Sequence, residues 1–192
     1  PVELAREAFA LYMEYPGAMS VFCDGRTYRD TVAMERFAHR NARRGSTEAR
    51  QPNDGRFTVV RDLTEWMSRH AHEVEKFCMF FDTAEQAQAA LPRFRALAGA
   101  EVVQGSPDNI ELTAQGVDKG TALLALADLL HIPREATVAV GDSENDRAML
   151  EKAGIAAVMA NGMPHIQALA DLVSTNDCDH DGVAELFERL GL

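Results

Sequence analysis

The chain has 192 residues, of which 46% are hydrophobic, and it carries a formal net charge of −11 at pH 7. This composition supplies a core for one domain or two small ones, and the acidic balance argues against nonspecific binding to nucleic acid. No apolar run approaches the roughly 20 residues of a membrane helix. Three cysteines without metal-ligand spacing indicate a reducing, cytoplasmic compartment.

Residues 1–115 show the hydrophobic periodicities of helices and short strands in mixed order. Asp24-Gly25 has the composition of a hairpin turn, Asp62 and Thr83 are expected helix caps, and Pro92 is expected to kink a helix. The elements expected in chain order are a helix over 3–15, strands over 19–23 and 26–30, a helix over 31–44, a polar loop over 45–55, a strand edge over 56–61, a helix over 63–72, a buried strand over 75–81, a helix over 83–98, and strands over 101–104 and 109–113.

After Gly116 helices and strands alternate strictly, which is typical of parallel βαβ units. The expected order is a helix over 119–130, a strand over 137–141, a helix over 144–153, a strand over 156–159, a helix over 164–170, a strand over 172–174 and a helix over 182–190. We therefore divide the chain into an α+β module, 1–115, and part of a doubly wound parallel sheet, 116–192. Three strands are few for a sheet that stands alone.

The stretch Gly141-Asp142-Ser143-Glu144-Asn145-Asp146 follows an apolar strand. Asp142 is expected at the strand tip, where open α/β sheets place their ligands, and Asp146 is expected one turn into the next helix, pointing back. Two carboxylates at this point suit Mg²⁺, which prefers oxygen ligands and keeps several waters. The alternative is a capping box formed by Ser143 and Asp146, and both interpretations can hold together.

The segment Gly116-Val117-Asp118-Lys119-Gly120 opens a helix. Asp118 is a suitable N-cap, and Lys119 falls in the first turn, where a cation opposes the helix dipole unless an anion is close. Helix N-termini also bind phosphate through free N–H groups, so Lys119 is a candidate phosphate ligand. It is one of three lysines against sixteen arginines. The alternative is a solvated lysine.

Other polar features are less specific. Asn161 follows the next strand and is a candidate pocket residue, although a turn that needs Gly162 explains the pair equally well. The acidic loop that holds Asp177, Asp179 and Asp181 is interpreted as solvated. Residues 26–61 contain nine arginines against four acidic residues. They form either a patch for an anionic ligand or a solvated helix face. The histidines show no ligand spacing.

These motifs resemble those of the haloacid dehalogenase-like phosphatases, in particular the Cof-type branch. The resemblance is strongest over residues 109–190 and rests on four landmarks in order: 110–120 with its lysine, 141–150 with the metal motif, 157–162, and 181–184. It implies the C-terminal half of a Rossmann-like core in 116–192 and an α/β cap that selects substrate in 1–115. It also implies a cytoplasmic, Mg²⁺-dependent phosphatase of a small phosphorylated metabolite, such as a sugar phosphate or a phosphorylated cofactor.

The resemblance assigns roles residue by residue. Lys119 neutralises the phosphoryl group, Asp142 ligates Mg²⁺, Asp146 holds a metal-bound water or orients Lys119, and Asn161 lines the substrate pocket. The family's nucleophile, the first Asp of a D-x-D-G-T motif, has no match in this chain. The stretch Cys23-Asp24-Gly25-Arg26-Thr27 is similar to the end of that motif, but Phe22 stands at the position of the nucleophile. We therefore expect a core segment ahead of Pro1.

Without that segment this chain is expected to be catalytically inactive and to hold metal weakly, since covalent catalysis through an aspartyl-phosphate needs the nucleophile. The expected protein partner is a separate N-terminal core segment or a second copy of the chain. Two other functions stay open. One is a non-catalytic protein, derived from a truncated phosphatase, that binds a ligand or partner through an exposed sheet edge. The other is a receiver-type signalling domain, against which the long first module argues.

Overall fold

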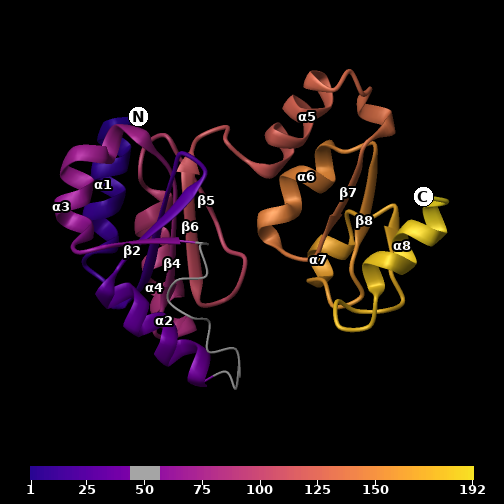
Figure 1. Cartoon of the computed structure of the whole chain (residues 1–192). Coiled ribbons are helices and arrows are strands. Elements are labelled where there is room, and N and C mark those ends of the chain that lie inside the picture. Colours follow the sequence, from indigo (N-terminus) through magenta and orange to yellow (C-terminus); the bar gives the residue numbers. More distant parts are fainter. Residues whose placement is uncertain (44–56) are drawn as a thin grey trace. The chain divides into compact units, whose positions relative to one another are not determined.

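The computed structural model describes residues 1–43 and 57–192, which form two compact units, Pro1–Gln115 and Gly116–Leu192 (Figure 1). The polar loop expected over 45–55 lies outside the described residues. No helix in the described part of the chain is long and apolar enough to cross a membrane. Each unit has its own sheet and its own core.

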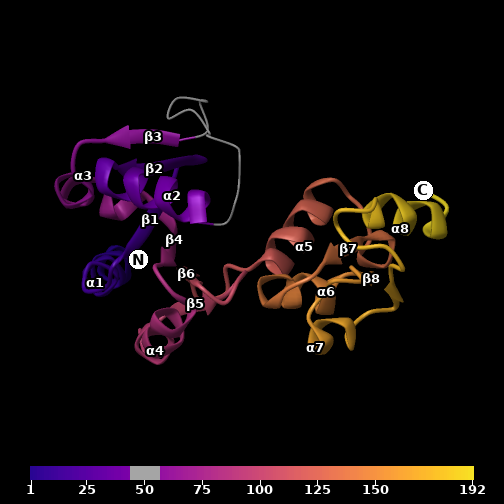
Figure 2. The ribbon, with the colours of Figure 1, turned by 90° about the horizontal axis from the view of Figure 1, so that it is seen from below.

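The first unit is a six-stranded sheet with helices packed against it. Figure 2 shows its strands in the order β3-β2-β1-β4-β6-β5, in which β2 and β3 are parallel and the other neighbours antiparallel. The elements are α1 (Val2–Tyr12), β1 (Gly17–Cys23), β2 (Arg26–Asp30), α2 (Thr31–Arg43), β3 (Phe57–Val60), α3 (Leu63–His70), a 3₁₀ turn (Ala71–Glu73), β4 (Val74–Phe81), α4 (Ala84–Arg95), β5 (Ala100–Val103) and β6 (Asn109–Ala114).

The main core of this unit lies on one face of the sheet. Alternate residues of the strands, such as Met19, Val21 and Phe77, meet buried residues of α1, α3 and α4 there. Tyr12 is buried in this core, and its hydroxyl donates to the carbonyl of Ile110 at 3.1 Å. Helix α2 contacts the sheet mainly at β1 and β2 and buries only Ala33, so it packs loosely.

The second unit is a parallel three-stranded sheet, β7-β8-β9, between two layers of helices. Buried residues of α6 and α7, with Leu123 of α5, cover one face, and Leu186 of α8 covers the other; Figure 1 shows β7 and β8 between α6 and α8. The elements are α5 (Lys119–Leu129), a 3₁₀ turn (Arg134–Ala136), β7 (Val138–Gly141), a 3₁₀ turn (Glu144–Asp146), α6 (Arg147–Lys152), β8 (Ile155–Val158), α7 (Pro164–Gln167), β9 (Leu172–Val173) and α8 (Gly182–Leu190).

The expected helices and strands of both units are confirmed in kind and order. Their ends differ at a few places. Strand β1 begins at Gly17 rather than Met19, at a point where a Cβ would lie 2.6 Å from the carbonyl oxygen of Phe80. The helix expected over 144–153 opens instead as a 3₁₀ turn and becomes α-helical only at Arg147. Asp24 and Gly25 both have positive φ, as a hairpin turn of the primed type requires.

Candidate functional site

The carboxylate of Asp146 is the centre of the polar cluster at the tip of β7. Its Oδ2 accepts the backbone N–H of Asp142 at 3.0 Å and that of Ser143 at 3.3 Å. Its side chain is only 8% exposed. The side chain therefore folds back over the strand tip and fixes the backbone that carries Asp142. This is the acidic half of a capping box, so the structural interpretation of the motif is confirmed.

Gly141 makes this fold-back possible. A Cβ at Gly141 would lie 2.5 Å from the Cβ of Asp146 and 2.9 Å from its Oδ2. Any larger residue would push the Asp146 carboxylate off the two N–H groups that it accepts. The motif thus needs a glycine before Asp142 because the Asp146 side chain approaches closely. A turn conformation is not the reason, since the φ of Gly141 is not positive.

Lys119 forms the second contact of Asp146. Its Nζ lies 2.5 Å from Oδ1 of Asp146, and the lysine side chain stays 50% exposed. Lys119 stands at the start of α5 directly after Asp118, which caps that helix by accepting the N–H of Thr121 at 2.6 Å. The structure therefore brings together two of the residues that the sequence singled out, although 26 others separate them.

Asp146 gives this cluster a pH dependence. Burial opposes its charged form, but the hydrogen bonds from Lys119 and from the two backbone N–H groups prevail, so the pKa of Asp146 is lowered below its usual value. A lowered folded pKa stabilises the protein above the unfolded pKa, about 3.9, and that contribution is lost as the pH falls through the folded pKa.

We predict that Asp146→Asn lowers the free energy of unfolding at pH 7 and that the difference from the wild-type chain shrinks below about pH 4. Urea denaturation of both chains between pH 7 and pH 3 measures this difference. A stability gap of constant size across the range would contradict the charge-dependent role of Asp146.

Lys152 is a contributor that the sequence did not reveal. Its Nζ lies 3.0 and 3.1 Å from the two carboxylate oxygens of Asp118. Gly120 lets α5 and α6 approach at this point, because a Cβ there would lie 2.2 Å from the carbonyl oxygen of Ala148. The pair therefore fixes the N-terminus of α5, and with it Lys119, against α6. The scarcity of lysine is the available signal for this residue, since Lys152 is one of three lysines in the chain.

Asp142 is held by its backbone and leaves its carboxylate available. Its N–H donates to Asp146, and its carbonyl accepts the N–H of Met163 at 2.9 Å. No hydrogen bond or ion pair is recorded for its side chain within residues 1–43 and 57–192. A half-buried carboxylate with no competing partner, on a backbone held by hydrogen bonds at its N–H and its carbonyl, is an oxygen donor suited to a hard cation.

Asn161 lies on a different contact network. Its Oδ1 accepts the N–H of Cys178 at 3.1 Å, which ties the loop after β8 to the acidic loop. In that loop Oδ1 of Asp177 lies 2.5 Å from Nδ1 of His180 and accepts the backbone N–H of Asp179 at 3.0 Å. The hydrogen bond from His180 lowers the pKa of Asp177. The Asn161 side chain therefore connects two loops. No contact of this side chain with Lys119 or Asp146 is recorded in the part of the chain described here.

A complete metal site is not present among the described residues. They include no group of three or more His, Cys, Asp or Glu side chains arranged to hold a metal ion. Both carboxylate oxygens of Asp146 are already engaged, by Lys119 and by the backbone. Of the two aspartates in the motif, only Asp142 keeps a carboxylate without a recorded partner in the described structure, so the motif fits one carboxylate position of a Mg²⁺ site.

Comparison with known proteins assigns the chain to a class. A family model described as haloacid dehalogenase-like hydrolase matches residues 5–187. Among solved structures, a haloacid dehalogenase-like hydrolase from B. subtilis superposes with a TM-score of 0.76 at 26% identity, over 96% of this chain and 70% of that one.

Two curated relatives are named as phosphatases. Phosphatase YwpJ of Bacillus subtilis is 39% identical over 106 residues, or 55% of this chain and 37% of that protein. The HMP-PP phosphatase of Cronobacter sakazakii is 33% identical over 124 residues, or 64% of this chain and 46% of that protein. The matched segments thus cover less than half of each of these relatives.

Proposed function

The chain belongs to the haloacid dehalogenase-like hydrolase family, in its Cof-type branch, and we propose that its second unit supplies part of the active site of a magnesium-dependent phosphatase for a small phosphorylated metabolite. One observation carries the proposal. The half-exposed Lys119 side chain pairs with Asp146, and Asp146 in turn binds the backbone N–H of Asp142, whose own carboxylate stays free among the described residues. The names of the two curated relatives support phosphatase chemistry.

Lys119 is the proposed phosphoryl ligand. An ammonium has three N–H donors, and within the described residues only the one to Asp146 is recorded for Lys119. Two donors remain for phosphoryl oxygens. Asp146 acts as a positioning residue, because its buried carboxylate accepts a hydrogen bond from Lys119 and holds the Nζ atom near the tip of β7. A fixed cation at this point favours the charge that develops during phosphoryl transfer.

Asp142 is the proposed magnesium ligand from this chain. Bound Mg²⁺ would supply further neutralisation of phosphoryl oxygen charge. The contribution of the chain is to fix the backbone that carries the Asp142 carboxylate, through the two hydrogen bonds to Asp146 and Met163. Asn161 stays a proposed pocket residue, and its side-chain Oδ1 already accepts the backbone N–H of Cys178.

The covalent part of the proposed reaction requires a carboxylate nucleophile, which would carry the aspartyl-phosphate and would stand beside Asp142. We place the strand that carries this nucleophile at the free edge of β7. Strand β7 pairs only with β8 in the described sheet, and an open edge offers backbone hydrogen bonds to an added strand.

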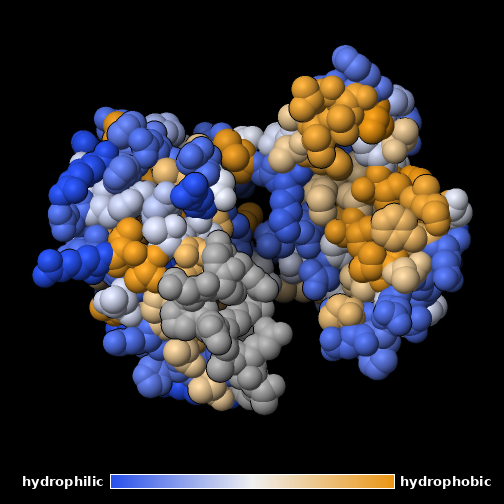
Figure 3. Space-filling view, in the orientation of Figure 1, coloured by the Kyte–Doolittle hydropathy of each residue, from blue (hydrophilic) through white to orange (hydrophobic). Residues whose placement is uncertain are grey.

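The exposed leucines at the end of α5 favour further packing on this unit. Leu126, Leu129 and Leu130 are 53%, 74% and 56% exposed, and Figure 3 shows apolar surface gathered on the part of the unit that α5 forms. The proposed occupant is a core segment of the whole protein or of a separate chain. Association with a second copy of this chain is the alternative, which the mass of the particle in solution distinguishes.

The test compares phosphate release from p-nitrophenyl phosphate by the whole gene-encoded protein and by the 192-residue chain. We expect turnover by the whole protein that stops when EDTA removes Mg²⁺, and no turnover above buffer by the chain alone. Magnesium-dependent turnover by the pure 192-residue chain would contradict the need for a nucleophile from elsewhere. Absence of turnover in the whole protein, over a panel of phosphorylated metabolites, would contradict the proposed function.

A further inference from the structure

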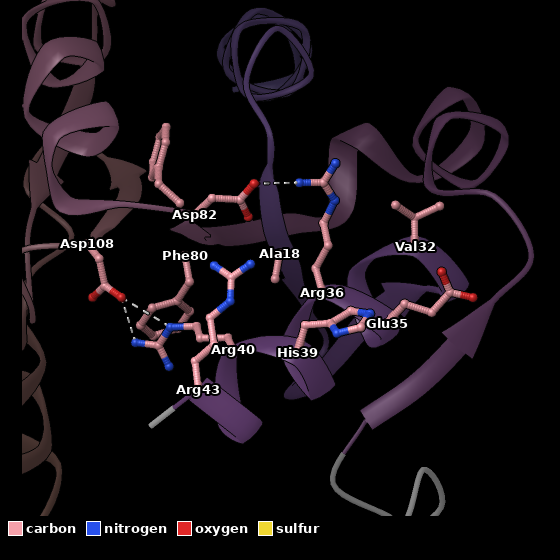
Figure 4. Close-up of a pocket in the computed structure, with 11 residues that line it drawn as sticks. Ala18, Val32, Glu35, Arg36, His39, Arg40, Arg43, Phe80, Asp82 and Asp108 are labelled. Carbon is pink, nitrogen blue, oxygen red and sulfur yellow. Dashed lines mark hydrogen bonds and ion pairs between the residues drawn. The ribbon is translucent and has the colours of Figure 1, made fainter. Parts of the chain in front are cut away.

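A cavity of about 490 Å³ lies wholly within the first unit, between α2 and the C-terminal end of β4 (Figure 4). Its apolar wall consists of Ala18, Val32, Phe80 and Phe81, and its polar wall of Glu35, Arg36, His39, Arg40, Arg43, Asp82 and Asp108. Three of these are the arginines that the sequence left open between an anion-binding patch and a solvated face.

Two of the three arginines are held by carboxylates. Arg40 donates through Nε and Nη2 to one oxygen of Asp108, at 3.2 and 3.0 Å. Its guanidinium carbon also lies 4.0 Å from the centre of the Phe80 ring, so this side chain is fixed on two sides. Arg36 makes a longer contact, 3.5 Å from its Nη1 to Oδ2 of Asp82. The side chains of Arg36 and Asp82 are 35% and 46% exposed. Arg36 is therefore the more easily redirected of the two.

Arg43 is the third arginine, and it carries the inference. Figure 4 shows its guanidinium between the Arg36–Asp82 and Arg40–Asp108 pairs, with no interaction drawn to it. No hydrogen bond or ion pair is recorded for Arg43 within the described residues. Glu35 also lines the cavity, but its carboxylate points away from Arg43. Arg43 is exposed, and the open space beside it is bordered by the guanidinium groups of Arg36 and Arg40, whose carboxylate partners are already engaged.

Such a cluster has a physical cost in the absence of an anion. Arg36, Arg40 and Arg43 stand at i, i+4 and i+7 on α2, and like charges at helical spacing repel one another. The negative end of the helix dipole offsets part of this repulsion for Arg40 and Arg43 in the last turn. A phosphate offsets it more fully, because the planar guanidinium fork matches two phosphate oxygens.

We propose that this cavity is a binding site for the phosphate group of a small metabolite. Arg43 is the principal ligand, and Arg36 turns from Asp82 to the phosphate when the site fills. Val32, Ala18 and Phe80 form the apolar wall for the rest of the molecule, as is usual in small-molecule sites. The site goes beyond the proposed function, because it lies in the first unit and uses none of Lys119, Asp142 or Asp146.

Inorganic phosphate is the probe, titrated at low ionic strength into the ¹⁵N-labelled 192-residue chain while amide shifts are followed by NMR. We expect saturable shifts in α2 and around residues 80–82. Arg43→Ala should weaken this binding about tenfold or more, as for loss of a hydrogen bond between charged groups. Arg95→Ala is the matched control, because Arg95 is an exposed arginine at the end of α4, outside the cavity. It should leave the binding unchanged.

Two further variants separate this site from its alternatives. Asp82→Asn removes the carboxylate that competes for Arg36, so it should tighten phosphate binding several-fold, which a merely structural role of Asp82 would not do. Lys119→Ala should remove any shifts near residues 116–121 and leave those in α2. The proposal is overturned if α2 shows no saturable shifts, if Arg43→Ala and Arg95→Ala weaken binding equally, or if Asp82→Asn does not tighten it. None of these outcomes depends on phosphatase activity.

Discussion

Replacing Lys119 with alanine is expected to reduce phosphatase turnover of the whole protein by about 10²- to 10³-fold, the usual effect of removing one group that stabilises transition-state charge. The reason is local. Lys119 presents an ammonium with free donors at the tip of β7, and its 50% exposed side chain leaves room for a ligand. The same substitution leaves the buried Asp146 carboxylate with only its backbone donors, so we also expect a loss of about 1–3 kcal/mol in the free energy of unfolding.

Lys152→Ala is the matched control for this prediction. Lys152 is also a lysine of the second unit paired to a carboxylate, that of Asp118, and its side chain is 34% exposed. Its loss should lower stability, since it loosens α5 against α6, and should lower turnover far less than the loss of Lys119. Steady-state kinetics and urea denaturation of both variants measure the two effects. Equal losses of turnover would mean that Lys119 acts only through the fold.

Amide substitution of the two aspartates of the motif is expected to change different properties: the magnesium requirement for Asp142, and the free energy of unfolding for Asp146. Asp142→Asn should leave the free energy of unfolding nearly unchanged, because no interaction is recorded for its carboxylate in the described structure. It should reduce Mg²⁺-dependent turnover of the whole protein on the order of 100-fold and raise the Mg²⁺ concentration needed for half-maximal rate. A neutral amide keeps the shape of the side chain but loses the charge that a hard cation requires.

Asp146→Asn should instead destabilise the chain by about 1–3 kcal/mol, because its two oxygens bind Lys119 and two backbone N–H groups. The half-maximal Mg²⁺ concentration should change less than in Asp142→Asn. Magnesium titration of the rate, read beside urea denaturation, separates the two variants. If Asp146→Asn raised the magnesium requirement as much as Asp142→Asn, the assignment of Asp146 to positioning would be wrong.

The elements of the fold were predictable because their signals are local. Alternation of helix and strand after Gly116 predicted the parallel sheet, and Asp118 and Asp62 cap the helices at which their side chains were expected. The 3₁₀ turn at Glu144–Asp146 was not predictable from periodicity, because it depends on how the Asp146 carboxylate folds over Gly141.

The site was predictable only in part. Lys119, Asp142 and Asp146 could be named from their motifs, and the Lys119–Asp146 contact makes them neighbours. The pairing of Lys152 with Asp118 could not be predicted, because it depends on the packing of α5 against α6. The contact of Asn161 with Cys178 is also tertiary and has no sequence signature. The arginines of α2 were visible as a helical pattern, but the cavity beside Arg43 forms only when β4 lies against that helix.

The most direct measurement is the rate of phosphate release by the whole protein with and without Mg²⁺, for the wild type and for Lys119→Ala, Asp142→Asn and Lys152→Ala side by side. If Lys119 and Asp142 belong to the active site, magnesium-dependent turnover is lost in the first two variants and largely kept in the third. Turnover that survives both Lys119→Ala and Asp142→Asn would contradict the assignment of the active site to the tip of β7.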